Sequence, residues 1–86
     1  MTMSPEDDAF YTYLDNNHVR LDNLGCLAAL DEERDEIFWC VLYDGEPEVE
    51  DGHFNWGLVT APDPEFLDAV NRHFGTSFKM DGFDGR

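Results

Sequence analysis

Residues 36–43, Glu-Ile-Phe-Trp-Cys-Val-Leu-Tyr, are the stretch of sequence that decides the fold. Aromatic and β-branched residues, which are enriched in β-strands, dominate it. Its apolar residues occupy odd and even positions alike, so both faces of such a strand carry hydrophobic side chains. The stretch therefore predicts either a central strand covered on both sides, or a strand with one covered face and an exposed aromatic patch.

The residues before this stretch predict its partner in a hairpin. Residues 19–30 are mostly apolar and are interrupted at Gly25, where they could divide into two strands. If residues 31–35 form the loop, Cys26 lies directly opposite Cys40, although a slip of one residue would send these side chains to opposite faces. Two cysteines are too few for a secreted disulfide scaffold, so we interpret them as buried thiols.

The residues after this stretch predict further strands. Asp44-Gly45 is a turn signal, and a polar connection follows it. In residues 53–60 large apolar residues alternate with polar or small ones, which predicts one half-buried strand. A short edge strand is expected near Phe78.

Two helices are expected at the ends of the chain. Ser4 followed by Pro5 and three acidic residues is typical of a helix start, and the helix should run to about Asn16 with Phe10, Tyr13 and Leu14 on its apolar side. Asp63-Pro64-Glu65 repeats the signal and predicts a helix over 64–74 that ends at Gly75.

Together these elements predict one acidic α+β domain spanning residues 1–86. The expected order is α-β-β-β-α, an antiparallel meander of three to four strands flanked by an N-terminal and a C-terminal helix. We expect both helices on one face of the sheet. The other face would then be open to solvent, to a partner or to a second copy in a homodimer.

The charge of the chain limits what it can bind. Twenty acidic residues against five basic ones give a net charge of −15, spread over the whole length. Nucleic-acid backbones and anionic membranes repel such a chain, so direct binding to either is not expected. The N-terminus has no signal-peptide pattern, and we expect a cytoplasmic protein.

No motif for catalysis or metal binding stands out. His18, His53 and His73 fall in different predicted elements, without zinc-site spacing, and we interpret them as surface or edge residues. The acidic residues 46–51 lack the order of a calcium loop, and no nucleophile or phosphate-loop signature occurs. We therefore expect no enzyme, no metal and no cofactor.

The candidate site is a partner-binding surface made of acidic clusters and one aromatic residue. One cluster lies at the predicted hairpin tip, and another follows an extended segment in which alternate glutamates would be spaced on a scale similar to successive phosphates. Trp39 is the aromatic residue we expect to be exposed beside them. The full candidate set is Asp31, Glu32, Glu33, Asp35, Glu36, Glu46, Glu48, Glu50, Asp51 and Trp39.

In size, single-domain build and charge the chain resembles phage-encoded anti-CRISPR proteins and other DNA-mimic inhibitors. The resemblance rests on composition over the whole chain and on no sequence motif, so no functional residue of those proteins can be assigned to a position of this sequence. It implies a stoichiometric inhibitor that blocks the basic groove of a DNA- or RNA-binding protein, such as a CRISPR complex or a nuclease. The alternative is a salt-adapted acidic domain with an unrelated interaction or regulatory role, because such domains are also rich in Asp and poor in Lys.

Overall fold

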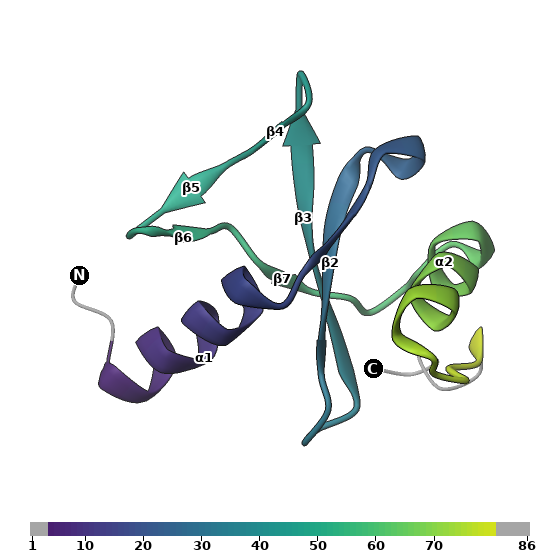
Figure 1. Ribbon diagram of the computed structural model, residues 1–86, viewed down its shortest axis with the longest axis horizontal. Coiled ribbons are helices and arrows are strands. Elements are labelled where there is room, and N and C mark those ends of the chain that lie inside the picture. Colours follow the sequence, from purple (N-terminus) through teal and green to yellow (C-terminus); the bar gives the residue numbers. More distant parts are fainter. Residues whose placement is uncertain (1–3, 81–86) are drawn as a thin grey trace.

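The computed structural model describes residues 4–80. It is an α+β fold with a helix at each end of an antiparallel sheet, as predicted (Figure 1). The elements are α1 (Pro5–Asn16), β1 (Val19–Leu21), a 3-10 turn (Asp22–Leu24), β2 (Cys26–Asp31), β3 (Glu36–Tyr43), β4 (Glu46–Pro47), β5 (Val49–Glu50), β6 (His53–Phe54), β7 (Gly57–Leu58) and α2 (Pro64–Phe74).

Both predicted helices are confirmed, and their ends follow from capping. At α1 the Ser4 hydroxyl accepts the Asp7 N–H at 3.2 Å, so the side chain satisfies an amide that has no partner within the helix. At α2 Gly75 takes a left-handed φ of 67° and donates its N–H to the Asn71 carbonyl. A residue with a Cβ would be strained in that conformation, which explains why the helix ends at a glycine.

The β2–β3 hairpin differs by one residue from the predicted register. Asp31 pairs with Glu36, so the loop has four residues instead of five, and Ala28 pairs with Trp39. Two local features shorten the loop: the Asp31 carboxylate accepts the Glu33 N–H at 3.2 Å, and Asp35 takes a left-handed φ of 52°. Asp and Asn tolerate this conformation better than most residues with side chains.

The register separates the two cysteines. Cys26 pairs with Val41, and Cys40 pairs with Leu27, so the predicted direct pairing of the thiols is wrong. Because side chains alternate along a strand, the thiols lie on opposite faces of the sheet, and both are free and buried. Burial raises the pKa of each thiol, and the neighbouring cysteine raises that of Cys26 further.

The two faces of the hairpin support separate cores, each closed by a different helix. Figure 1 shows α1 and α2 on either side of β2 and β3. The face under α2 buries Leu21, Cys26, Ala28, Leu30, Ile37, Val59, Phe66, Leu67 and Val70. The face under α1 buries Leu14, Leu27, Ala29, Phe38, Cys40 and Trp56. The prediction that both helices cover one face is therefore wrong, and the fully open face proposed for a homodimer is not present.

Beyond β3 the chain forms two tight turns. Asp44-Gly45 and Asp51-Gly52 both have positive φ at each residue, the conformation of two-residue hairpin turns that match strand twist. The second turn joins β5 to β6, and β7 then returns to pair with β3. The single strand predicted over residues 53–60 is therefore wrong, since it consists of two short strands with different partners.

Two expectations concern single elements. The division of residues 19–30 at Gly25 is confirmed, because Gly25 takes a left-handed φ of 66° between the 3-10 turn and β2. Within the described residues, which end at Met80, no edge strand forms near Phe78. Instead the Phe78 N–H donates to the Asn71 side chain at 2.8 Å, and the Phe78 carbonyl accepts from the same side chain at 3.0 Å.

The first prediction concerns α1. Leu14 has no exposed surface, whereas Tyr13 was expected on the apolar side and is 44% exposed. We expect Leu14→Ala to lower the free energy of unfolding by about 2–5 kcal/mol through the cavity it leaves. Tyr13→Ala should cost less than about 1 kcal/mol. Urea unfolding of both variants measures this, and equal losses would place α1 in a different orientation.

The second prediction concerns the thiols. With 2% and 1% of their surfaces exposed, Cys26 and Cys40 should react with a thiol reagent only as the protein unfolds. The rate of modification should rise with urea along the unfolding transition. Rapid labelling of either cysteine in the native protein, or an intramolecular disulfide after mild oxidation, would contradict the observed register.

Candidate functional site

The last part of β3 carries an exposed apolar strip. It lies on the same face of the sheet as α2, beyond the part that α2 covers. Alternation places Trp39, Val41 and Tyr43 on the same face as the fully buried Ile37. The buried core under α2 includes Ile37 but none of the next three positions on that face. Trp39 is 41% exposed and Tyr43 is 62% exposed, so we name these three residues the Trp39 strip. The predicted exposure of Trp39 is confirmed.

A groove of about 750 Å³ opens beside the Trp39 strip. Trp39 and Leu58 line it together with the segment that leads into α2 and the first turn of that helix. The lining is mixed, with apolar side chains such as Phe66 and Val59 beside the carboxylates of Asp63 and Glu65. A groove of this size has room for several side chains of a partner, and its apolar and acidic lining is complementary to apolar and basic ones.

Carboxylates also lie on the other side of Trp39. A smaller hollow of about 190 Å³ is lined by Trp39, Tyr43, Gly57 and the exposed Glu48. Trp39 pairs with Gly57 across the sheet, and its indole lies beside this glycine, with Nε1 3.7 Å from where a Cβ would stand. Glu46 pairs with Tyr43 at the end of the strip. The Trp39 strip is therefore bordered by acidic residues from three segments of the chain.

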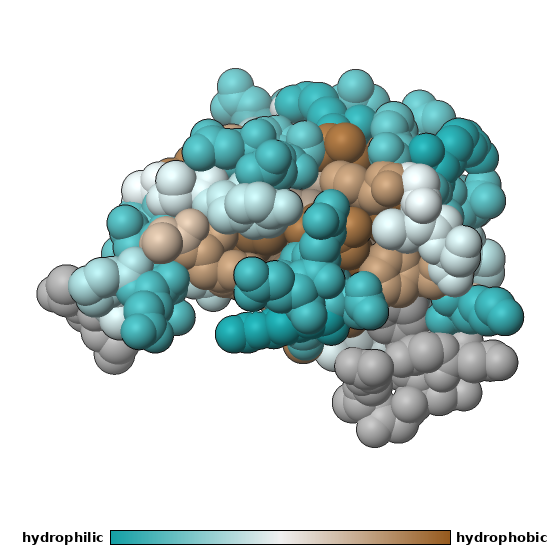
Figure 2. All heavy atoms as spheres, turned by 60° about the horizontal axis from the view of Figure 1, so that its bottom comes forward, coloured by the Kyte–Doolittle hydropathy of each residue, from teal (hydrophilic) through white to brown (hydrophobic). Residues whose placement is uncertain are grey.

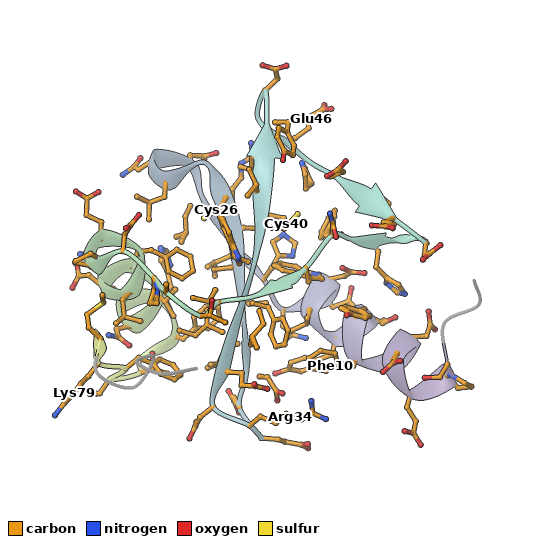
Figure 3. The ribbon with its side chains drawn as sticks, turned by 180° about the vertical axis from the view of Figure 1, so that it is seen from behind. Phe10, Cys26, Arg34, Cys40, Glu46 and Lys79 are labelled. Atoms are coloured by element: carbon orange, nitrogen blue, oxygen red, sulfur yellow. The ribbon has the colours of Figure 1, made fainter. Side chains whose placement is uncertain are left out.

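The candidate acidic residues do not form one site. The hairpin-tip cluster and the cluster at Glu46–Asp51 lie at opposite ends of β3, about 23 Å apart for an eight-residue strand. Figure 3 shows this separation, with Arg34 at the hairpin tip and Glu46 at the far end. Figure 2 views the tip end, where polar side chains project in front of brown, hydrophobic surface. Only the second cluster borders the Trp39 strip.

Within the hairpin tip the residues differ in availability. Glu32, Glu33 and Asp35 are exposed, and Glu36 is half-buried. Asp31 is only 7% exposed, and its carboxylate accepts the Glu33 N–H. Asp31 therefore shapes the turn, and its interpretation as a partner-binding residue does not fit its burial.

The second cluster is exposed but not arranged along one strand. Glu46 belongs to β4, Glu50 belongs to β5, and the chain leaves the sheet between them at Glu48. The Asn55 amide donates to the Glu48 carboxylate at 3.4 Å, and the Asn55 N–H donates to the Glu48 carbonyl at 2.9 Å. The predicted straight row of glutamates is therefore broken into two short extended pieces.

The arginines of the described residues are each paired with a carboxylate on their own segment. The pairs are Arg20 with Asp22, Arg34 with Asp31, and Arg72 with Asp68. Arg20 also donates to the Gly45 carbonyl, and Arg34 lies over the Phe10 ring. Most of the exposed carboxylates in residues 4–80 have no cationic partner there, so their field is directed outward.

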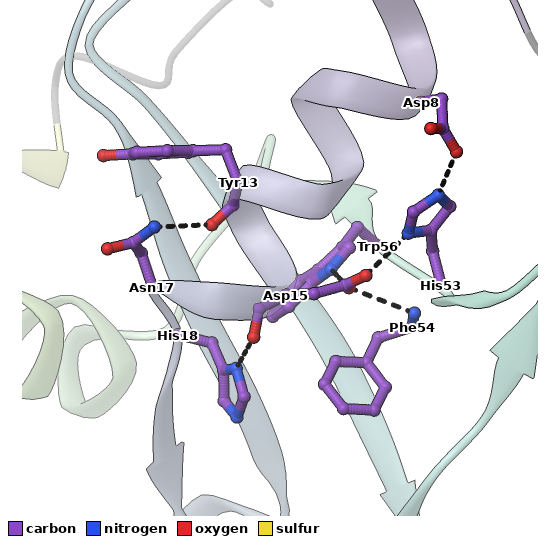
Figure 4. Close-up of polar contacts among 8 residues, drawn as sticks. All are labelled: Asp8, Tyr13, Asp15, Asn17, His18, His53, Phe54 and Trp56. Carbon is purple, nitrogen blue, oxygen red and sulfur yellow. Dashed lines mark hydrogen bonds and ion pairs between the residues drawn. The ribbon is translucent and has the colours of Figure 1, made fainter. Parts of the chain in front are cut away.

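A group of partly buried polar contacts on α1 was not foreseen from the sequence. The His53 side chain is 10% exposed and lies between two carboxylates of α1 (Figure 4). Its Nε2 is 2.7 Å from Asp8 Oδ1, and its Nδ1 is 2.6 Å from Asp15 Oδ2. We name Asp8, His53 and Asp15 the histidine clamp. His53 was interpreted as a surface or edge residue, and it lies on the two-residue strand β6 with most of its side chain covered.

Asp15 is the centre of this group. Its Oδ1 accepts the Phe54 N–H at 3.2 Å and the Trp56 Nε1–H at 2.9 Å, while Oδ2 contacts His53. One carboxylate thus binds three groups from the segment that follows β5. Hydrogen bonds to Asp8 and then Asp15 raise the pKa of His53, and partial desolvation opposes them. The second Asp-Gly pair, at residues 51–52, was the signal that could have placed His53 at the start of a hairpin strand.

No family model, curated protein or solved structure matches this chain. Among residues 4–80, neither helix is long and apolar enough to cross a membrane. In the same residues no three His, Cys, Asp or Glu side chains are placed to hold a metal ion.

The third prediction separates the two tryptophans. Trp39 is 41% exposed and Trp56 is 7% exposed, so acrylamide, a neutral quencher, should reach only the first. We expect strong fluorescence quenching in Trp56→Phe, which retains Trp39, and weak quenching in Trp39→Phe. Circular dichroism would confirm that both variants are folded. Weak quenching in both variants would show that the Trp39 strip is covered, and strong quenching in both would show that Trp56 is exposed.

Proposed function

We propose that this protein is a stoichiometric inhibitor that occupies the basic, nucleic-acid-binding groove of a partner protein. The observation that carries the proposal is the Trp39 strip, an exposed aromatic surface bordered by carboxylates that have no cationic partner in the described residues. A groove that binds nucleic acid presents Lys and Arg beside surfaces on which bases stack. Acidic groups around an exposed indole are complementary to both features.

The two parts of the surface have different roles in this proposal. A net charge of −15 attracts a basic partner over a distance and sets the association rate, which salt weakens. Trp39 and Tyr43 supply the buried contact, because aromatic residues dominate the binding energy of protein interfaces. The glutamates near the strip, Glu46 and Glu48, lie where they can pair with the arginines of the partner.

The likeness in composition to DNA-mimic inhibitors supports the same proposal, and it implies a nuclease or a nucleic-acid surveillance complex as partner. Such a target would be met in the cytoplasm. The tip cluster of Glu32, Glu33 and Asp35, about 23 Å away along β3, would reach a second part of an elongated basic groove.

The fourth prediction tests the proposed binding. The immobilised protein is incubated with lysate of its source organism at low salt, and bound proteins are eluted with duplex DNA and identified. The eluted protein is then purified, and its Kd is measured against variants. Trp39→Ala should weaken binding by about 30-fold or more, as expected for an aromatic residue at the centre of an interface that contributes 2 kcal/mol.

Matched variants separate the contributions. Tyr13→Ala removes an equally exposed aromatic residue from α1 and should leave the Kd unchanged. Changing Glu46, Glu48 and Glu50 to Gln should lower mainly the association rate, and the same change at the tip shows whether that cluster also contacts the partner. If DNA elutes no nucleic-acid-binding protein, or if Trp39→Ala and Tyr13→Ala bind alike, the proposal is wrong.

Salt adaptation makes the opposite prediction about stability. A salt-adapted domain depends on high salt to screen its carboxylates, and it should unfold in dilute buffer. The inhibitor should remain folded and should bind best at low salt. A melting temperature measured from low to molar salt distinguishes the two, and unfolding in dilute buffer would favour salt adaptation.

A further inference from the structure

We propose that the histidine clamp is a pH-dependent latch that holds the β5–β6 hairpin against α1 and loosens it when His53 loses its proton. This inference does not depend on the identity of a partner. It rests on how three side chains connect two elements that are far apart in the sequence.

The β5–β6 hairpin has few attachments of its own to the main sheet. β5 and β6 pair only with each other, through Val49 with Phe54 and Glu50 with His53. The hairpin projects from the end of β3 and lies beside α1, as Figure 1 shows. A two-stranded hairpin of this length is not stable in water by itself. Its position therefore depends on contacts with α1.

Those contacts are of two kinds. Some are hydrogen bonds that do not involve the His53 ring, and the others are made by the ring itself and depend on its charge. The bonds from the Phe54 N–H and the Trp56 Nε1–H to Asp15 Oδ1 need no proton on His53, but they break whenever the hairpin moves away from α1. The two contacts of His53 are different, because both of its ring nitrogens face carboxylate oxygens. Only imidazolium can donate from both nitrogens at once. A neutral ring must turn a lone pair toward one of the two carboxylates.

The surroundings of His53 reinforce this dependence on charge. Asp8 and Asp15 face it from α1, and the ring centroid of Tyr11, on the same helix, is 6.0 Å from that of the His53 ring. On its own hairpin Glu50 lies opposite, and Asp51 stands two residues before it in the turn.

One other titratable ring lies close to the clamp. His18 packs edge-on against Phe54 at 5.3 Å, and its Nδ1 lies 2.8 Å from the Asp15 carbonyl. This bond requires only a donated N–H, which either charge state of His18 supplies. Carboxylates thus surround His53, and none of the described arginines is paired within this cluster. When the imidazolium is lost, the carboxylates repel one another without compensation.

The sign of the effect follows from the raised pKa of His53. The latch is complete below the ordinary histidine pKa of about 6.5, and it is lost as pH rises through the higher pKa of the folded protein. Glu48, Glu50 and Asp51 move with the hairpin, so the latch also sets where one acidic cluster stands relative to Trp39. A more alkaline solution frees that cluster.

The test follows local opening of the hairpin by NMR between about pH 5 and about pH 9. The protection factor of the Phe54 amide, corrected for intrinsic exchange, reports the hairpin, and the amides of β2 and β3 report the core. We expect Phe54 protection to fall with the titration of the His53 imidazole while core protection stays constant. Constant protection of Phe54 through that titration would overturn the proposal.

Two variants of α1 form a matched pair. Asp8→Asn removes the charge opposite His53 Nε2, whereas Asp7→Asn removes a neighbouring exposed charge from the same first turn. Asp8→Asn should shift the His53 titration and the loss of Phe54 protection together to lower pH, and Asp7→Asn should shift neither beyond its general effect on charge. Equal shifts in the two variants would show a diffuse field instead of a latch.

A third variant removes the titration itself. His53→Gln retains a hydrogen-bonding side chain without a proton that titrates in this range. Its Phe54 protection should be low and independent of pH. A pH-dependent loss of Phe54 protection that persists in this variant would assign the effect to another group.

Discussion

The pairing of Ala28 with Trp39 is the constraint on which the rest of the structure depends. It divides the apolar side chains of the central hairpin into two sets that point to opposite faces of the sheet, and each face needs its own helix to exclude water. α1 packs on the set that includes Leu27 and Phe38, and α2 packs on the set that includes Ile37. α2 covers only the first part of β3, where Ile37 lies, and Trp39 remains at the surface on the same side.

A second interaction holds the rest of the chain to this framework. The Asp15 carboxylate binds the backbone of Phe54, the indole of Trp56 and the ring of His53. A partly buried carboxylate with three donors has its hydrogen-bonding capacity well satisfied. Removal of any one donor would leave a carboxylate oxygen at the end of α1 without that partner and would destabilise the fold. The acidic composition thus has an internal use as well as an external one, because Asp8 and Asp15 attach the segment that would otherwise project freely.

Much of this fold could be predicted from local signals. The helix bounds followed from Ser4-Pro5 and Asp63-Pro64, the central strand from its apolar run, and the exposure of Trp39 from apolar residues on both faces. The register of the β2–β3 hairpin could not be predicted, because the four-residue loop depends on the side-chain contact of Asp31 and the left-handed conformation of Asp35. The histidine clamp was missed because it joins positions 38 and 45 residues apart, and no local pattern records such contacts.

The register also connects the fold to the proposed function, since it decides on which face Trp39 stands. The most direct measurement is a set of cross-strand NOEs on the isotope-labelled protein. We predict contacts from the backbone of Trp39 to Ala28, and from Cys40 to Leu27, together with contacts from Trp56 to Leu14. Contacts from Trp39 to Leu27 and from Cys40 to Cys26 would place Trp39 on the side of α1 and contradict the account.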